Sequence, residues 1–169
     1  MSYSDPDIQE APINLVGLQM VNQEHLDSYP GYSIMDPAAL LNDKGDIDLQ
    51  IFCKLYLTDD FISTHANATP YIYMTAITDS QQSVYLSQQY GPLPIDVGNF
   101  MEYTFHIQIS SELIEKYRVH QFRLIGSVTS HPQRTAGIAE SLRIGRFFNT
   151  IVPIRKRGES HATGIAITK

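Results

Sequence analysis

The chain has 169 residues, 43% hydrophobic and 18% charged, with a formal net charge of −6 at pH 7. This length predicts one domain, and the spread of aliphatic and aromatic residues excludes a largely disordered chain. The single cysteine, Cys53, excludes an intrachain disulfide, and no apolar run approaches the roughly 20 residues that a membrane-spanning helix needs.

The N-terminal region is acidic and polar. We expect residues 1–12 to form a flexible acidic arm and residues 13–169 to form a single β-rich domain. The arm lacks the basic and apolar regions of a secretory signal peptide, so we expect a cytoplasmic protein, or a virion component if the protein is viral.

Residues 13–20 predict a first strand. Asp36 followed by Pro37 is typical of a helix start, and we expect a short helix that ends near Gly45.

Every second residue from 47 to 57 is an aliphatic residue or cysteine, and the residues between them are polar, charged or aromatic. This alternation predicts a strand with one buried face. Its inward residues are Ile47, Leu49, Ile51, Cys53, Leu55 and Leu57. The position of Cys53 among them predicts a buried, unreactive thiol. Phe52 and Tyr56 fall on the outer face, where aromatic side chains can anchor an interface.

The later segments continue the β-rich pattern. Residues 71–78 are apolar on both faces, which predicts a central strand between two packed layers. We expect further strands near residues 84–86, 101–109, 122–128, 151–154 and 164–167, and short helices within 112–120 and 135–148. The fold class is therefore mainly β, a β-rich α+β fold: an antiparallel sandwich or open barrel with two or three short helices.

Charge is divided unevenly along the chain. Residues 1–115 contain sixteen acidic and two basic residues, whereas residues 116–169, the basic C-terminal third, contain ten basic and two acidic residues. Such asymmetry indicates a basic surface that meets an anionic partner or the acidic surface of another copy. The opposite charges could also neutralise one another within one molecule.

No catalytic or metal-binding motif stands out. The six histidines lack the close spacings of zinc ligands, and no serine lies in a nucleophile-elbow sequence. We therefore expect no cofactor, no metal and no small-molecule substrate. An enzyme whose site assembles from distant residues, around His65 or His106, is one alternative.

These observations favour a non-enzymatic structural protein that associates with copies of itself through acidic and basic faces. Successive copies would build a ring, layer or tube, as in a virion matrix, capsid or tail-assembly protein. The expected basic face consists of Arg143, Arg146, Arg155, Lys156 and Arg157. The expected acidic face consists of Asp43, Asp46, Asp48, Asp59 and Asp60, with Phe52 and Tyr56 as aromatic contacts.

A second alternative is an adaptor domain that binds nucleic acid, nucleoprotein or an anionic membrane through the basic third. Its affinity would fall as salt rises, because binding to phosphates releases counterions. The net charge of −6 opposes this alternative, since long-range repulsion hinders the approach of a polyanion.

Overall fold

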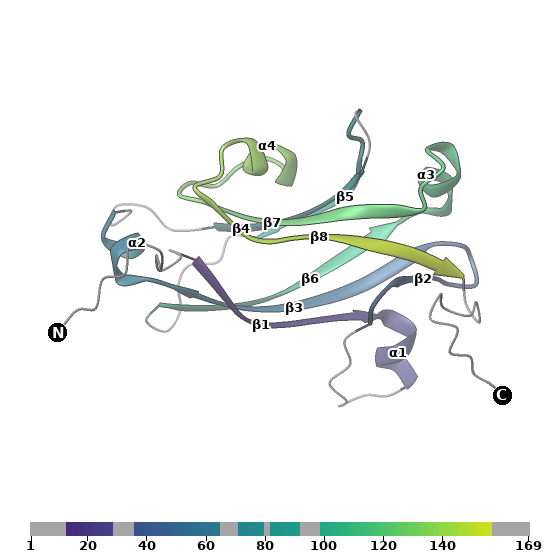
Figure 1. The fold of residues 1–169 in the computed structure, drawn as a ribbon, viewed down its shortest axis with the longest axis horizontal. Helices are drawn as coiled ribbons and strands as arrows, with labels where there is room; N and C mark the ends of the chain where they lie inside the picture. Colours follow the sequence, from purple (N-terminus) through teal and green to yellow (C-terminus); the bar gives the residue numbers. More distant parts are fainter. Residues whose placement is uncertain (1–12, 29–35, 65–70, 80–81, 92–98, 157–169) are drawn as a thin grey trace, which may run out of the picture.

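The computed structural model describes residues 13–28, 36–64, 71–79, 82–91 and 99–156, which contain eight strands and four helices (Figure 1). In chain order these are β1 (Ile13–Asn22), α1 (Gln23–Ser28), β2 (Ala39–Leu41), β3 (Ile47–Leu57), α2 (Asp59–Thr64), β4 (Tyr71–Thr78), β5 (Tyr85–Gly91), β6 (Phe100–Ile109), α3 (Ser111–Lys116), β7 (Gln121–Thr129), α4 (Ala136–Ser141) and β8 (Gly145–Lys156). No helix in these ranges has the length and apolar character to cross a membrane.

The strands form one curled, open sheet whose two halves face each other (Figure 1). The hydrogen-bonded order is β1-β3-β2-β8-β7-β4-β5, and β6 pairs with β3. Every pairing is antiparallel except that of β2 with β8, which is parallel and joins the two halves. The predicted β-rich α+β class is confirmed, with four short helices in the described ranges instead of two or three.

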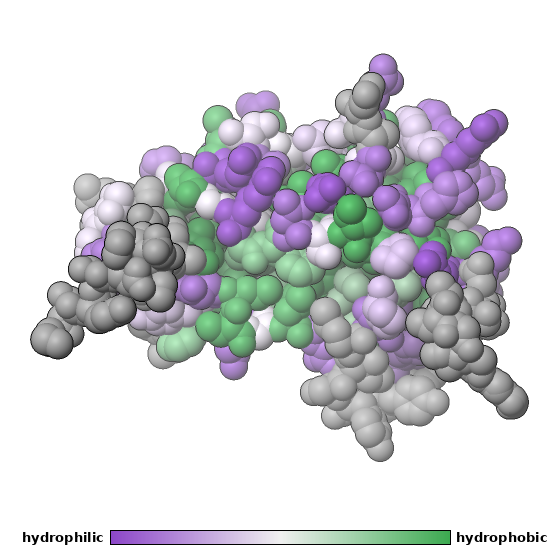
Figure 2. Space-filling view, viewed as in Figure 1, coloured by the Kyte–Doolittle hydropathy of each residue, from purple (hydrophilic) through white to green (hydrophobic). Residues whose placement is uncertain are grey.

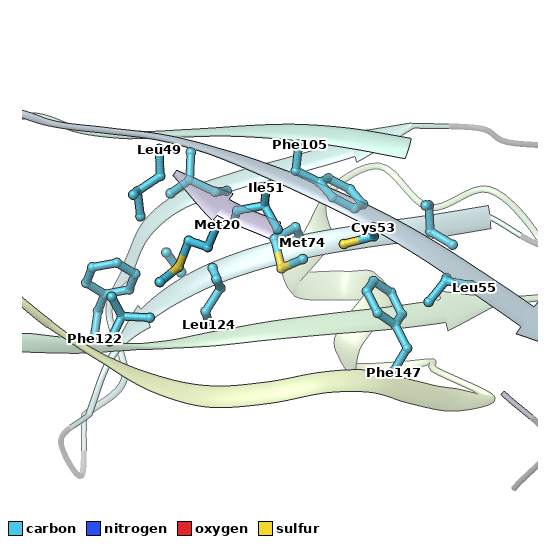
Figure 3. Packing of buried hydrophobic residues seen from close by; sticks show 14 of the residues in the cluster. Met20, Leu49, Ile51, Cys53, Leu55, Met74, Phe105, Phe122, Leu124 and Phe147 are labelled. Carbon is cyan, nitrogen blue, oxygen red and sulfur yellow. The ribbon is translucent and has the colours of Figure 1, made fainter. Parts of the chain in front are cut away.

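The core fills the space between the two halves, where the labelled side chains of β3 and β6 point toward those of β4, β7 and β8 (Figure 3). The inward set predicted for β3 is confirmed, because all six of its members are buried. In β6 the alternation holds as well, since Met101, Phe105, Ile107 and Ile109 are buried. A period of two thus gives each strand one face for the core.

Both faces of β4 are covered, as its sequence predicted. Ile72 and Met74 belong to the main core. On the other face, Tyr73 packs with Ala136 and Ala139 of α4 in a second, smaller cluster. Helix α4 therefore supplies the outer layer that an apolar-faced strand requires.

The helix predicted after Asp36 is wrong, whereas the helix predicted within residues 135–148 is present as the shorter α4. Asp36 does not start a helix: residues 39–41 form β2, where Ala39 pairs with Ile154 of β8. Backbone pairing with a distant strand outweighs the local capping signal. Residues 135–148 divide into α4, which Thr135 caps through its Oγ1 (3.1 Å from the Ile138 amide), and the start of β8 at Gly145.

Candidate functional site

A buried polar cluster fixes the position of β2. The Asn22 side chain donates to the Ala38 carbonyl (2.9 Å) and accepts from the Leu40 amide (2.8 Å). The Asp36 carboxylate accepts from the backbone amide of Asn22 (2.7 Å) and lies 2.9 Å from the His25 Nδ1. Because buried polar groups need partners, this arrangement ties β2 to the end of β1.

An open groove of about 440 Å³ lies beside β2, and we call it the acidic groove. Its carboxylates are Glu24, Asp27, Asp43, Asp46 and Asp48, with Lys44 as its one lysine. Asp46 accepts from the Ser111 amide (2.8 Å), and Asp48 contacts the His106 ring. Asp27 and Asp43 are exposed and can meet an incoming cation.

A second open groove, of about 460 Å³, lies where β2, α3 and the end of β8 meet, and we call it the basic groove. Its polar side chains are Arg118, His120, Arg155, Lys156 and Glu115. Its apolar residues are Leu41, Ile114, Val119 and Ile154. The groove therefore combines a cationic rim with an apolar floor.

The end of α3 places Arg118 at this groove. The Val119 amide donates to the Ile114 carbonyl (2.9 Å), and the Arg118 amide donates to the Glu115 carbonyl (3.2 Å). This is the Schellman pattern, which needs a left-handed residue and usually uses glycine there. Arg118 adopts that conformation, with φ of 49°.

The two grooves lie at the same end of the molecule, where α1, β2 and α3 gather (Figure 1). We call this the charged end. Leu40 of β2 lines the acidic groove and Leu41 lines the basic groove. Successive strand residues point in opposite directions, so a three-residue strand separates two surfaces of opposite charge.

Two predicted members of the basic face lie elsewhere. The Glu140 Oε1 accepts from the Arg146 Nε (2.5 Å) and lies 3.1 Å from the Arg143 Nη1. The other Glu140 oxygen accepts from the buried Ser127 hydroxyl. Both arginines thus share a carboxylate beside α4, and α4 lies toward the other end of the molecule (Figure 1).

The remaining predicted residues divide in the same way. Asp59 and Asp60 begin α2, at the opposite end of β3 from the charged end, and Asp59 accepts from the Asn99 side chain (2.7 Å). Phe52 and Tyr56 are half-buried on the outer face of β3, where the ring of Tyr56 lies 5.2 Å from that of Phe100. Arg157 lies outside the described residues.

The charged end thus gathers Arg155 and Lys156 with Asp43, Asp46 and Asp48, and the members that sequence analysis missed include Glu24, Asp27, Arg118 and His120. The sequence carries no signal that these four share a site, because they come from α1 and from the loop after α3. Only strand order brings them together.

Figure 2 shows one face of the molecule, with hydrophilic side chains concentrated at the charged end and over α4. Hydrophobic residues are exposed on the surface between these two regions, over β1 and β8. Hydrophilic side chains are thus gathered in separate patches on this face.

Two of the candidate reactive groups, Cys53 and His106, are engaged in the fold. Burial raises the pKa of the Cys53 thiol to about 12, so the thiol is protonated at neutral pH. His106 contacts Asp48 at the border of the acidic groove, and His65 lies outside the described residues. Within the ranges that the structure describes, no three His, Cys, Asp or Glu side chains are grouped to hold a metal ion.

No protein-family model matches the sequence, and no curated protein matches it. Among solved structures, the chain is similar to a glycosyl hydrolase family 2 member from Bacteroides cellulosilyticus (TM-score 0.42, 10% identity, 83% of this chain) and a β-glucuronidase from glycoside hydrolase family 2 (TM-score 0.48, 11% identity, 85% of this chain). It spans only 15% and 13% of those chains. It also spans 98% of a protein from Archaeoglobus fulgidus (TM-score 0.39, 9% identity, 83% of this chain).

Proposed function

We propose that the chain is a non-enzymatic assembly protein whose copies pair through the charged end. One observation carries the proposal: the acidic and basic grooves lie on either side of β2. A cationic and an anionic surface on one molecule complement the same two surfaces on a second molecule. Such complementarity steers encounter and fixes orientation.

The position of the grooves favours a closed pair over an open chain of copies. When two complementary patches lie next to each other, a two-fold axis between them places each patch against its complement on the partner. An isologous contact of this kind closes after two copies. Acidic and basic surfaces at opposite ends of the molecule would instead have favoured the ring, layer or tube that the charge asymmetry of the sequence indicated.

The ion pairs proposed between the two copies are individually weak and sensitive to salt, so dimer formation should depend on ionic strength. An exposed ion pair contributes about 0–1 kcal/mol and is screened at high ionic strength. Exposed Asp27 and Asp43 on one copy would face Arg118 and Arg155 on the other. We therefore expect a dimer that forms at low salt and dissociates as salt is added.

Sedimentation velocity at several ionic strengths measures this directly. The expected result is a dimer at low salt and high protein concentration, converting to monomer with added salt. Arg143→Gln, which removes a charge beside α4, should leave the dimer intact. A wild-type monomer at low salt, or a dimer that salt does not affect, would count against pairing through the charged end.

The adaptor alternative is less favoured at this end of the molecule. A nucleic acid or anionic membrane that approached Arg118, Arg155 and Lys156 would also approach the five carboxylates of the acidic groove. These carboxylates would repel the negatively charged nucleic acid or membrane. Location in the cytoplasm or in a virion stays a prediction from the sequence.

A further inference from the structure

We infer that the basic groove binds an anionic amphiphile, a small molecule with one unbranched apolar chain and one carboxylate, sulfate or phosphate head. This ligand site shares Arg118 and Arg155 with the surface proposed for self-association, but ligand binding needs only the monomer. The inference rests on the combination of an apolar floor with a cationic rim in a groove of about 460 Å³. Small-molecule sites have volumes of about 300–1,000 Å³, mostly apolar linings and a few polar groups that orient the ligand.

The floor is built from side chains that the core holds in place. Val119 is buried within the main core, and Leu41, Ile114 and Ile154 are partly buried against it. They come from β2, α3, the loop after α3, and β8. Because an alkyl chain lying on them would remove apolar surface from water without rearranging the core, the floor favours an apolar ligand segment.

The rim determines the charge of the ligand. Arg118, Arg155 and Lys156 surround the groove with His120, and Glu115 is its one acidic member. The Nη1 of Arg155 donates to the backbone carbonyl of the preceding residue, Ile154 (3.0 Å). The other guanidinium hydrogens of Arg155 can therefore bind a ligand. No acidic side chain within ion-pair distance of Arg118 or Arg155 is found in the described part of the chain. Arginine suits the planar oxygens of a carboxylate or phosphate.

The backbone of Arg118 gives a second, independent argument. A left-handed residue ends α3, and glycine would adopt that conformation without strain. The arginine therefore adds nothing that the turn requires. Strained non-glycine residues concentrate at functional sites. What the side chain adds is a guanidinium at the mouth of the groove.

Isothermal titration calorimetry with decyl phosphate below its micelle concentration tests the inference, in salt that keeps the protein monomeric. We expect saturable one-to-one binding. Decanol supplies the chain alone and inorganic phosphate supplies the head alone, and both should bind much more weakly. The double variant Arg118→Gly with Arg155→Gln should lose affinity by about tenfold or more, because it removes two charge-assisted contacts. Arg143→Gln, beside α4, should bind as the wild type does.

Four results would overturn the inference. They are equal binding of decanol, equal binding of inorganic phosphate, unchanged affinity in the double variant, and binding to anionic vesicles without binding to monomeric decyl phosphate. Thermal melting shows whether each variant is folded. If the double variant is unfolded, Arg155→Gln alone provides the test. A negative titration would not contradict the proposed self-association, because sedimentation velocity tests the dimer and the titration tests ligand binding to the monomer.

Discussion

Leu40 and Leu41 are neighbours in β2, yet Leu40 lines a groove rich in carboxylates and Leu41 lines a groove rimmed by arginine and lysine. The two leucines point apart because successive strand residues alternate in direction. Part of the charge asymmetry of the sequence therefore lies at one end of the fold, as an acidic and a basic groove on either side of β2. This relationship supports both pairing between copies and a ligand site on the basic side.

Substitution of Gly126 should destabilise the fold. The ring of Phe147 lies over the Gly126 backbone, so a methyl group at residue 126 would overlap the ring. Overpacking of this kind costs about 1–3 kcal/mol. We expect Gly126→Ala to lower the free energy of unfolding by this amount, which urea denaturation shows as a lower midpoint. Gly17→Ala is the matched control, because its methyl group would lie 3.4 Å from the Lys54 Cβ, an ordinary contact. Equal stability of the two variants would contradict the packing described for Phe147.

Loss of the Asn22 side chain should release β2. Asn22→Ala removes the partner of the Leu40 amide and one partner each of the Ala38 carbonyl and Asp36. A buried polar group left without a partner costs about 1–3 kcal/mol. Hydrogen exchange should show faster exchange of the Leu40 amide and lower overall stability. Asn149→Ala, which removes an exposed contact with Arg123, should have a small effect. Unchanged exchange at Leu40 would exclude this role for Asn22.

Arg118→Gly should preserve or raise stability. A left-handed conformation costs a non-glycine residue about 1–2 kcal/mol, and glycine avoids most of that cost. Arg118→Val, with its branched Cβ, should be clearly less stable than either. Thermal melting of the three proteins gives the ranking. If valine were tolerated as well as glycine, the end of α3 would not have the backbone conformation described above.

Cys53 should make stability fall at alkaline pH. Burial raises the pKa of its thiol from 9.0 to about 12, so the folded chain keeps a proton that the unfolded chain loses. The resulting contribution is fully present below pH 9 and is lost as pH rises toward 12, at roughly 1 kcal/mol per pH unit. The stability difference between the wild type and Cys53→Ala should shrink over this window. At pH 8 the native thiol should react with a thiol reagent only as fast as the protein unfolds.

The sequence predicted the features that depend on neighbours along the chain. Alternation in β3 identified its buried face and the burial of Cys53, and the two apolar faces of β4 indicated a second covering layer. The start of a helix at Asp36 failed because its carboxylate accepts from Asn22, fourteen residues earlier, and β2 pairs with β8. Local capping signals carry no information about such partners.

The candidate site was predictable only in part, for the same reason. Charge asymmetry drew attention to the acidic and basic residues, but it could not separate Arg143, which shares Glu140 with Arg146, from Arg155 at the charged end. Strand order decides that separation. Arg118 reaches the groove through a left-handed turn, a conformation that an arginine in the sequence does not indicate.

A charge-exchange experiment tests pairing through the charged end most directly. One variant carries Glu24→Lys, Asp27→Lys and Asp43→Lys, which makes its acidic groove cationic, and the other carries Arg155→Glu and Lys156→Glu. Each variant alone presents two like-charged grooves, whereas a mixture restores both opposite contacts across a two-fold axis. We predict that sedimentation at low salt shows monomers for each variant alone and a dimer for the equimolar mixture. A mixture that stays monomeric, or a single variant that dimerises as the wild type does, would contradict the account.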